Sequence, residues 1–430
     1  MIFTEKYNDR LGEKYLYGVH ETGLEIFMVP KDHIRSTAIL GTRYGAMHRI
    51  FKTEKDDDFI TVPDGVAHFL EHKLFENEDG SDTFYRFGEY GGNANAFTSD
   101  EMTAYYFTAT DNYYENLEIL LDFVSSPYFT EETVKKELGI IGQELKMYLD
   151  NPYRRLYKNL LEALYVDSHI KIDVGGTEES IAKITPEILY RCYGTFYNLT
   201  NMTLCLAGSF EADKVVKICD KILKPSEPVT ITHSFPEEPE YINKELISEK
   251  FPIALPMFYA GIKDNMTADK EKDPISSLKR IWEHKIISEL LFGKSSDFYN
   301  DLYDKGLIND KFSAGYSSGC NYSFIYFCAE TRTPDKVIEL IKEKINKTCD
   351  DTDSLKEDFE ICKRMIYADC LQEWNSTADI AELLLEYRFM GADALDIPDV
   401  VSAITFEDIV KRLKESYCTE KMAVSLVEPK

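Results

Sequence analysis

The chain has 430 residues, of which 44% are hydrophobic, and its formal net charge is −27. A chain of this length buries more than one core, so we expect at least two domains. The acidic balance argues against nucleic-acid binding, because contacts to phosphate need clustered Lys and Arg. No apolar run reaches the roughly 18 residues of a membrane span, and residues 1–16 are mixed and charged. We therefore expect a cytoplasmic protein with no membrane association.

The cysteines indicate a reducing environment. Nine are scattered along the chain without a C-x-x-C pair. Most of them lie among apolar neighbours, as Cys205 and Cys328 do. We expect reduced structural thiols in a cytosolic protein, and neither a disulfide framework nor a thiolate zinc site is indicated.

In chain order, the first predicted elements are two strands, Gly23–Pro30 and Ser36–Tyr44, both rich in β-branched and apolar residues. The charged run between Phe51 and Phe59 predicts a loop. Residues 66–75 then contain the pattern H-x-x-E-H, which fits a helix with an apolar face formed by Val66, Leu70 and Leu74.

The opposite face of this predicted helix carries side chains that can bind a metal ion or transfer a proton. His68 and His72 are four residues apart, so both point to one side, with Glu71 beside them. Two imidazoles at this spacing suit a zinc ion, and the carboxylate can take a proton from a water molecule. The order of residues is the inverzincin signature. The same pattern also arises by chance on an exposed helix face, so a third ligand is needed.

Residues 130–150 predict a second helix, with Thr130 as its N-cap. Glu137 and Glu144 are seven residues apart and share a face. That face also carries apolar residues, which we expect to be buried (Ile140, Ile141 and Tyr148). Buried carboxylates are costly without compensation, and a zinc ion would supply it. Gly139 and Gly142 weaken the helix, which indicates that another helix approaches closely there.

Around the predicted first helix the chain resembles the pitrilysin/insulinase family of zinc peptidases. The similarity is strongest from Asp64 to Asn151 and is carried by HFLEHKLFE and GIIGQE. It favours the half-length subfamily that includes the mitochondrial processing peptidases. The resemblance implies an α+β fold of two similar domains, each a mostly antiparallel sheet packed with helices.

The resemblance also implies roles for single residues. His68, His72 and Glu144 would bind zinc, Glu71 would be the general base, and Glu137 would orient a ligating His. The stretch Asn95-Ala96-Phe97 would lie on an exposed sheet edge beside the zinc, where a peptide substrate adds as an extra strand. If that edge is covered, the same residues form an ordinary hairpin that leads to the strand Thr103–Thr108.

The second half of the chain resembles the first. Residues 224–245 hold four prolines and predict a linker between a zinc-binding domain, residues 1–223, and an inactive domain, residues 246–430. Pairs such as Leu74-Phe75 and Leu291-Phe292 recur about half the chain apart. In this register the motif positions become Lys285, Ser288 and Glu289, so we expect one Zn²⁺ per chain.

The C-terminal segments predict helices that carry no further catalytic signal, followed by a closing strand at Met422–Val427. In the family, the inactive domain commonly supplies an Arg and a Tyr to the substrate. Here Tyr303 stands at the position of the Arg, and Asn309 ends the stretch in place of a Tyr. We therefore expect a heterodimer with a paralogous subunit that lacks the zinc motif and supplies Arg and Tyr, with a homodimer as second choice.

The predicted function is a zinc-dependent metalloendopeptidase that acts on peptides or peptide precursors. Two alternatives remain open, a non-catalytic structural subunit and a peptide-binding subunit with a peptidase-like fold. Absence of zinc after gentle purification would favour the structural subunit, and a peptide-cleavage assay with and without a chelator would separate the peptide-binding subunit from a peptidase.

Overall fold

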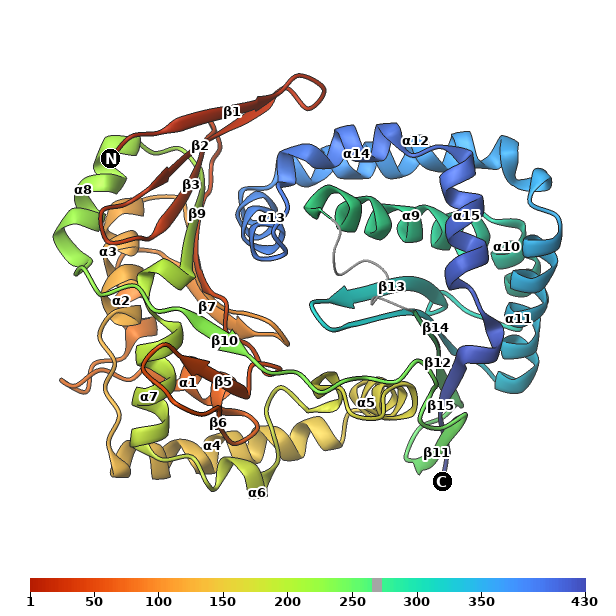
Figure 1. Ribbon diagram of the computed structural model, residues 1–430, viewed down its shortest axis with the longest axis horizontal. Coiled ribbons are helices and arrows are strands. Elements are labelled where there is room, and N and C mark those ends of the chain that lie inside the picture. Colours follow the sequence, from red (N-terminus) through yellow and green to blue (C-terminus); the bar gives the residue numbers. More distant parts are fainter. Residues whose placement is uncertain (265–272) are drawn as a thin grey trace. The chain divides into compact units, whose positions relative to one another are not determined.

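The computed structural model describes residues 1–264 and 273–430 (Figure 1). Its contacts form two compact units. Unit 1 comprises Met1–Leu145, Ile172–Phe235 and Gln372–Leu395, and unit 2 comprises Lys146–Lys171, Pro236–Leu371 and Asp396–Lys430. Each unit combines helices with a mostly antiparallel sheet, which confirms the predicted α+β class with two similar domains. The domain boundaries predicted after residues 223 and 245 stay a prediction. By contacts, each compact unit contains segments from both halves of the chain.

Unit 1 is built on a seven-stranded sheet with the order β1-β2-β3-β9-β4-β8-β7. Neighbouring strands are antiparallel except for β3 and β9, which are parallel. The strands are β1 Thr4–Asn8, β2 Glu13–Val19, β3 Glu25–Pro30, β4 Ser36–Thr42, β7 Asn93–Thr98, β8 Thr103–Ala109 and β9 Met202–Gly208. Every residue of β4 and β9 is buried, as expected for strands covered on both faces.

The helices of unit 1 include one from the C-terminal half of the chain. Helix α13, Thr377–Phe389, packs against β4 and β9 (Figure 1). Leu385 reaches the backbone of Gly41, where an added Cβ would lie 2.6 Å from its Cδ2 atom. Arg388 pairs with Glu25 on β3. The first 223 residues therefore do not contain all of the core of unit 1.

The other helices in this part of the chain are α1 Val66–Leu74, α2 Thr83–Glu89, α3 Tyr113–Val124, α4 Glu131–Leu149, α6 Glu178–Ile181, α7 Pro186–Phe196 and α8 Ala212–Ile222. Short 3-10 helices lie at His169–Lys171, Leu199–Asn201, Glu373–Asn375 and Ala394–Asp396.

A second, small sheet in unit 1 corrects a sequence prediction. Strand β5, Ile50–Thr53, pairs with β6, Ile60–Thr61, and with β10, Ile231–His233. The predicted loop between Phe51 and Phe59 is therefore partly strand. The charged residues of this stretch give it the sequence pattern of a loop. Phe51 is nevertheless fully buried and packs against Phe196. Strand β10 lies within the predicted linker, and its pairing partner is distant in sequence.

Unit 2 contains a five-stranded sheet with the order β11-β15-β12-β14-β13. Its strands are β11 Leu246–Phe251, β12 Met257–Lys263, β13 Ser313–Gly319, β14 Tyr322–Glu330 and β15 Met422–Pro429, the last of which confirms the predicted closing strand. Helix α5, Pro152–Leu164, packs against β12 and β15. The remaining helices are α9 Pro274–Phe292, α10 Asp297–Asp304, α11 Pro334–Asp350, α12 Lys356–Gln372, α14 Ile397–Ala403 and α15 Phe406–Ser416, with 3-10 helices at Asp353–Leu355 and Thr419–Lys421.

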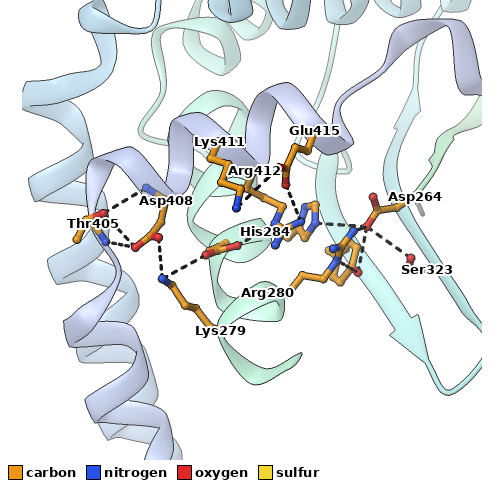
Figure 2. A network of polar contacts seen from close by, with 12 residues as sticks. Asp264, Lys279, Arg280, His284, Ser323, Thr405, Asp408, Lys411, Arg412 and Glu415 are labelled. Carbon is orange, nitrogen blue, oxygen red and sulfur yellow. Dashed lines mark hydrogen bonds and ion pairs between the residues drawn. The ribbon is translucent and has the colours of Figure 1, made fainter. Parts of the chain in front are cut away.

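The order helix, helix, strand, strand recurs in the two units, as α1-α2-β7-β8 and as α9-α10-β13-β14. In unit 2 this motif holds a buried polar network (Figure 2). Arg280 on α9 pairs with Asp264, and His284 Nε2 lies 3.5 Å from the same carboxylate. Tyr316 on β13 stacks on the His284 ring with a centroid distance of 3.9 Å. The network ties α9 to the sheet.

Among the described residues, no helix combines the length and the apolar character that crossing a bilayer requires.

Candidate metal centre

Helix α1 has the two faces that its sequence predicts. Val66, Leu70 and Leu74 are buried in the core of unit 1. The helix starts after Gly65, whose φ of 90° lies in the left-handed region. Here a Cβ would also lie 2.6 Å from the carbonyl oxygen of Gly175, so glycine is required by both conformation and space.

The three predicted metal ligands converge in unit 1. Glu144 Oε2 on α4 lies 3.4 Å from His72 Nε2 and 3.8 Å from His68 Nε2 on α1. The ligand atoms of the three residues all lie within 4.8 Å of one another. Ligand atoms around a tetrahedral zinc ion, with bonds of about 2.0–2.1 Å, are about 3.4 Å apart. Two imidazoles and one carboxylate at these separations fit zinc with an open fourth position.

Glu137 lies about two helical turns before Glu144 on α4 and contacts the second histidine. Its Oε1 atom is 3.0 Å from His72 Nδ1, which leaves Nε2 to face Glu144. Burial lowers the pKa of His72, but the hydrogen bond and charge of Glu137, together with the charges of Glu71 and Glu144, raise it, and the net pKa is raised. A hydrogen bond of this kind orients a ligating imidazole and selects its tautomer.

Glu71 is separate from the converging ligand atoms. It is only 9% exposed, and its Oε2 atom accepts a hydrogen bond of 2.6 Å from Thr98 Oγ1 on β7. Burial raises the pKa of Glu71, opposed by the Thr98 hydroxyl and the charge of His72. A carboxyl group with a raised pKa accepts a proton more readily at neutral pH.

The structure of α4 confirms the predicted N-cap and corrects the predicted set of buried residues. Thr130 caps it, with Thr133 N donating to Thr130 Oγ1 at 3.2 Å. Tyr148, expected to be buried, is only half-buried. Ile140, also expected to be buried, is 48% exposed. At 100° per residue it falls outside the buried stripe, which follows three- and four-residue steps. That stripe is Val134, Glu137, Ile141 and Leu145.

The interpretation of the two α4 glycines is wrong for this chain. A Cβ built on Gly139 or Gly142 would meet no described atom within 4 Å. No described helix of this chain approaches them closely, so packing of that kind does not explain their presence.

The predicted substrate residues lie on β7, at one end of the sheet order. Asn95, Ala96 and Phe97 pair with β8, and no described strand pairs with the other side of β7. Asn95 is exposed, while Ala96 and Phe97 are half-buried. The predicted edge position is thus present among the described residues.

Sequence reasoning missed Thr98. Alternation along β7 places its side chain on the opposite face from Phe97, which is a signal that the sequence offers. Its contact with Glu71 depends on how β7 lies against α1, which neither segment encodes locally.

Comparisons with known proteins agree with this geometry. Residues 62–178 match the family model described as Insulinase (Peptidase family M16), and residues 183–366 match the model described as Peptidase M16 inactive domain. The chain belongs to peptidase family M16. The register predicted from the sequence repeat, in which the motif positions become Lys285, Ser288 and Glu289, stays a prediction. Among the described residues, His68, His72 and Glu144 form the one candidate metal group.

Individual M16 relatives cover almost the whole chain. The uncharacterized zinc protease YmfH of Bacillus subtilis (strain 168) is 35% identical, over 98% of this chain and 98% of that protein. The crystal structure of an M16-like peptidase from Alicyclobacillus acidocaldarius is 31% identical, with a TM-score of 0.91 over 100% of this chain and 99% of that one. A probable mitochondrial-processing peptidase subunit beta of Arabidopsis thaliana is 23% identical, over 85% of this chain and 71% of that protein.

Proposed function

We propose that this M16 chain is a zinc-dependent endopeptidase that hydrolyses peptides or peptide precursors. The observation that carries the proposal is the convergence of His68, His72 and Glu144 at separations that suit zinc. In this proposal the three residues hold one zinc ion per chain, Glu137 orients His72, and Glu71 is the general base.

When bound, zinc lowers the pKa of a coordinated water molecule and polarises a peptide carbonyl group. Glu71 accepts the proton that the attacking water releases as its oxygen bonds to the carbonyl carbon. The same carboxyl group then returns the proton to the leaving nitrogen as the C–N bond breaks. Its burial and raised pKa suit both transfers.

The substrate would add to β7 as a further strand, beside Asn95, Ala96 and Phe97. The open side of β7 among the described residues supports this mode. Pairing through the backbone depends little on sequence, so it suits extended peptides of varied composition.

The partner in this proposal is a paralogous subunit that lacks the zinc motif. Tyr303, which stands where the family commonly has Arg, lies on α10 and is 51% exposed. Asn309 ends the same stretch without a Tyr. A partner that supplies both missing side chains would complete a substrate site, and a homodimer is the second choice.

The test is cleavage of a mixed peptide library, read by mass spectrometry of the products. The zinc-loaded chain is assayed with and without a chelator, and with and without a candidate paralogue. We expect cleavage that the chelator abolishes and the paralogue increases. Cleavage that is unaffected by chelation would refute the metallopeptidase, and full activity of a proven single chain would refute the need for a partner.

A further inference from the structure

The carboxylate of Glu71 is held from behind by a hydroxyl group. Thr98 Oγ1 donates to Glu71 Oε2 at 2.6 Å, and the described residues donate no second hydrogen bond to this carboxylate. Hydrogen bonds to a charged acceptor are about twice as strong as neutral ones. One oxygen of Glu71 is thereby engaged and the other is left for a reacting water molecule.

The ladder between β7 and β8 fixes the position of Thr98. Thr98 and Thr103 are directly opposite each other in the register, so their side chains lie on the same face of the sheet. Their hydroxyl oxygens are 3.3 Å apart. Thr103 is fully buried, which leaves Thr98 little freedom on that side.

The direction of the Thr98 proton follows from its neighbour. Thr103 Oγ1 donates its single proton to the carbonyl oxygen of Tyr44 at 2.8 Å. Thr98 therefore receives no proton from Thr103. An ionised carboxylate only accepts, so the Thr98 proton points to Glu71.

Two buried tyrosines lie beyond the threonine pair. The hydroxyl oxygens of Tyr105 and Tyr197 are 2.8 Å apart, and burial, together with the negative charge of Glu71, raises the pKa of both. Both phenols stay protonated and neutral at physiological pH. Among these hydroxyl groups, that of Thr98 alone donates to the carboxylate of Glu71 in the part of the chain that the structure describes.

We propose that Thr98 is a positioning residue for Glu71, and this rests on the proposed peptidase function. Thr98 keeps Oε2 engaged, so that the proton released by the attacking water goes to Oε1 and later moves from Oε1 to the leaving nitrogen. Thr98 keeps its own proton throughout. Because β7 is also the strand beside which the substrate would add, one short segment aligns the peptide and the base.

The kinetic test compares Thr98→Val, which keeps the shape of the side chain, with Thr98→Ser, which keeps the hydroxyl. We expect Thr98→Val to lower kcat about 10- to 100-fold, the cost of a misplaced catalytic group. KM and zinc affinity should stay within about twofold, since only a step after binding is affected. Thr98→Ser should restore most of kcat.

A matched control is Thr108→Val, which removes a hydroxyl from the far end of the same ladder, where Thr108 pairs with Asn93. It should leave kcat unchanged. Full kcat in Thr98→Val, or equal impairment of Thr98→Ser and Thr98→Val, would overturn the inference.

A second measurement needs no activity. In metal-free protein, the thermal midpoints of wild type, Thr98→Val, Glu71→Ala and the double variant form a cycle. We expect Thr98→Val to lower the midpoint clearly in wild type and less than half as much beside Glu71→Ala. Equal effects in both backgrounds would show that the two residues are not coupled. If zinc-loaded wild type cleaves no peptide, the proposed function fails, while this cycle still decides whether Thr98 holds Glu71.

Discussion

His72 Nδ1 lies 3.0 Å from Glu137 Oε1, so a carboxylate on α4 holds an imidazole of α1 from the side opposite to Glu144. The two helices that carry the candidate ligands are thereby joined at the metal group itself. Glu137 is buried, and this contact gives its carboxylate a hydrogen-bond partner.

Replacing Glu137 should therefore weaken zinc binding without removing a ligand. Glu137→Leu is expected to lower zinc affinity about 10- to 100-fold, because His72 loses the partner that sets its tautomer and orientation. Competition with a chelating dye measures this affinity. Glu132→Gln, an exposed change on the same helix, is the control and should bind zinc like wild type. Wild-type affinity in Glu137→Leu would contradict the role given to Glu137.

The packing of α13 on the sheet of unit 1 should be visible in the free energy of unfolding. Leu385 is fully buried against β4 near Gly41. Leu385→Ala is expected to lower the unfolding free energy of unit 1 by about 2–5 kcal/mol, through lost burial and the cavity that remains. Urea titration followed by far-UV circular dichroism measures the change. Ile140→Ala, at an exposed position of unit 1, should change it by less than about 0.5 kcal/mol.

The buried histidine of unit 2 should make that unit less stable in mild acid. Burial, opposed by the Asp264 carboxylate, lowers the pKa of His284 to about 4. Between the unfolded pKa of about 6.5 and the folded one, the unfolded chain binds a proton that the folded chain does not. The unfolding free energy should thus fall by about 3 kcal/mol as the pH drops from 6.5 to 4, and this contribution is constant below that.

NMR titration of the His284 ring checks this directly. The charged groups that face the ring or contact its partners are Asp264, Arg280 and Arg412 (Figure 2). The aromatic rings that stack on it are those of Tyr316 and Tyr417. Asp264 has a lowered pKa and stays ionised across the window, so its own titration does not account for the slope. A His284 pKa near 6.5 would contradict the prediction.

Local spacing in the sequence grouped the candidate residues in two pairs, and the family resemblance assigned Glu144 as the third ligand. The four-residue step from His68 to His72 and the seven-residue step from Glu137 to Glu144 each place two side chains on one helix face, and the structure brings the faces together. The two-domain α+β class was predicted from the resemblance. Helix caps such as Thr130 could be predicted from the sequence because a cap depends on residues only a few positions away.

Features that depend on distant contacts could not be predicted in the same way. Strand β5 has a charged, loop-like sequence, and it forms because β10, far along the chain, pairs with it. Helix α13 has an ordinary amphipathic pattern, and such a pattern does not predict which sheet the helix packs against. The sequence around Thr98 does not distinguish it from other strand threonines, because its contact with Glu71 depends on the position of α1.

The role of Glu71 beside the three metal ligands is tested by comparing zinc content and peptide cleavage in wild type and Glu71→Gln. We expect one zinc ion per chain in both proteins, because the metal ligands remain. We expect cleavage to be about 10²- to 10⁴-fold slower in the variant, because the general base is lost. Equal cleavage rates at equal zinc content would contradict this role of Glu71.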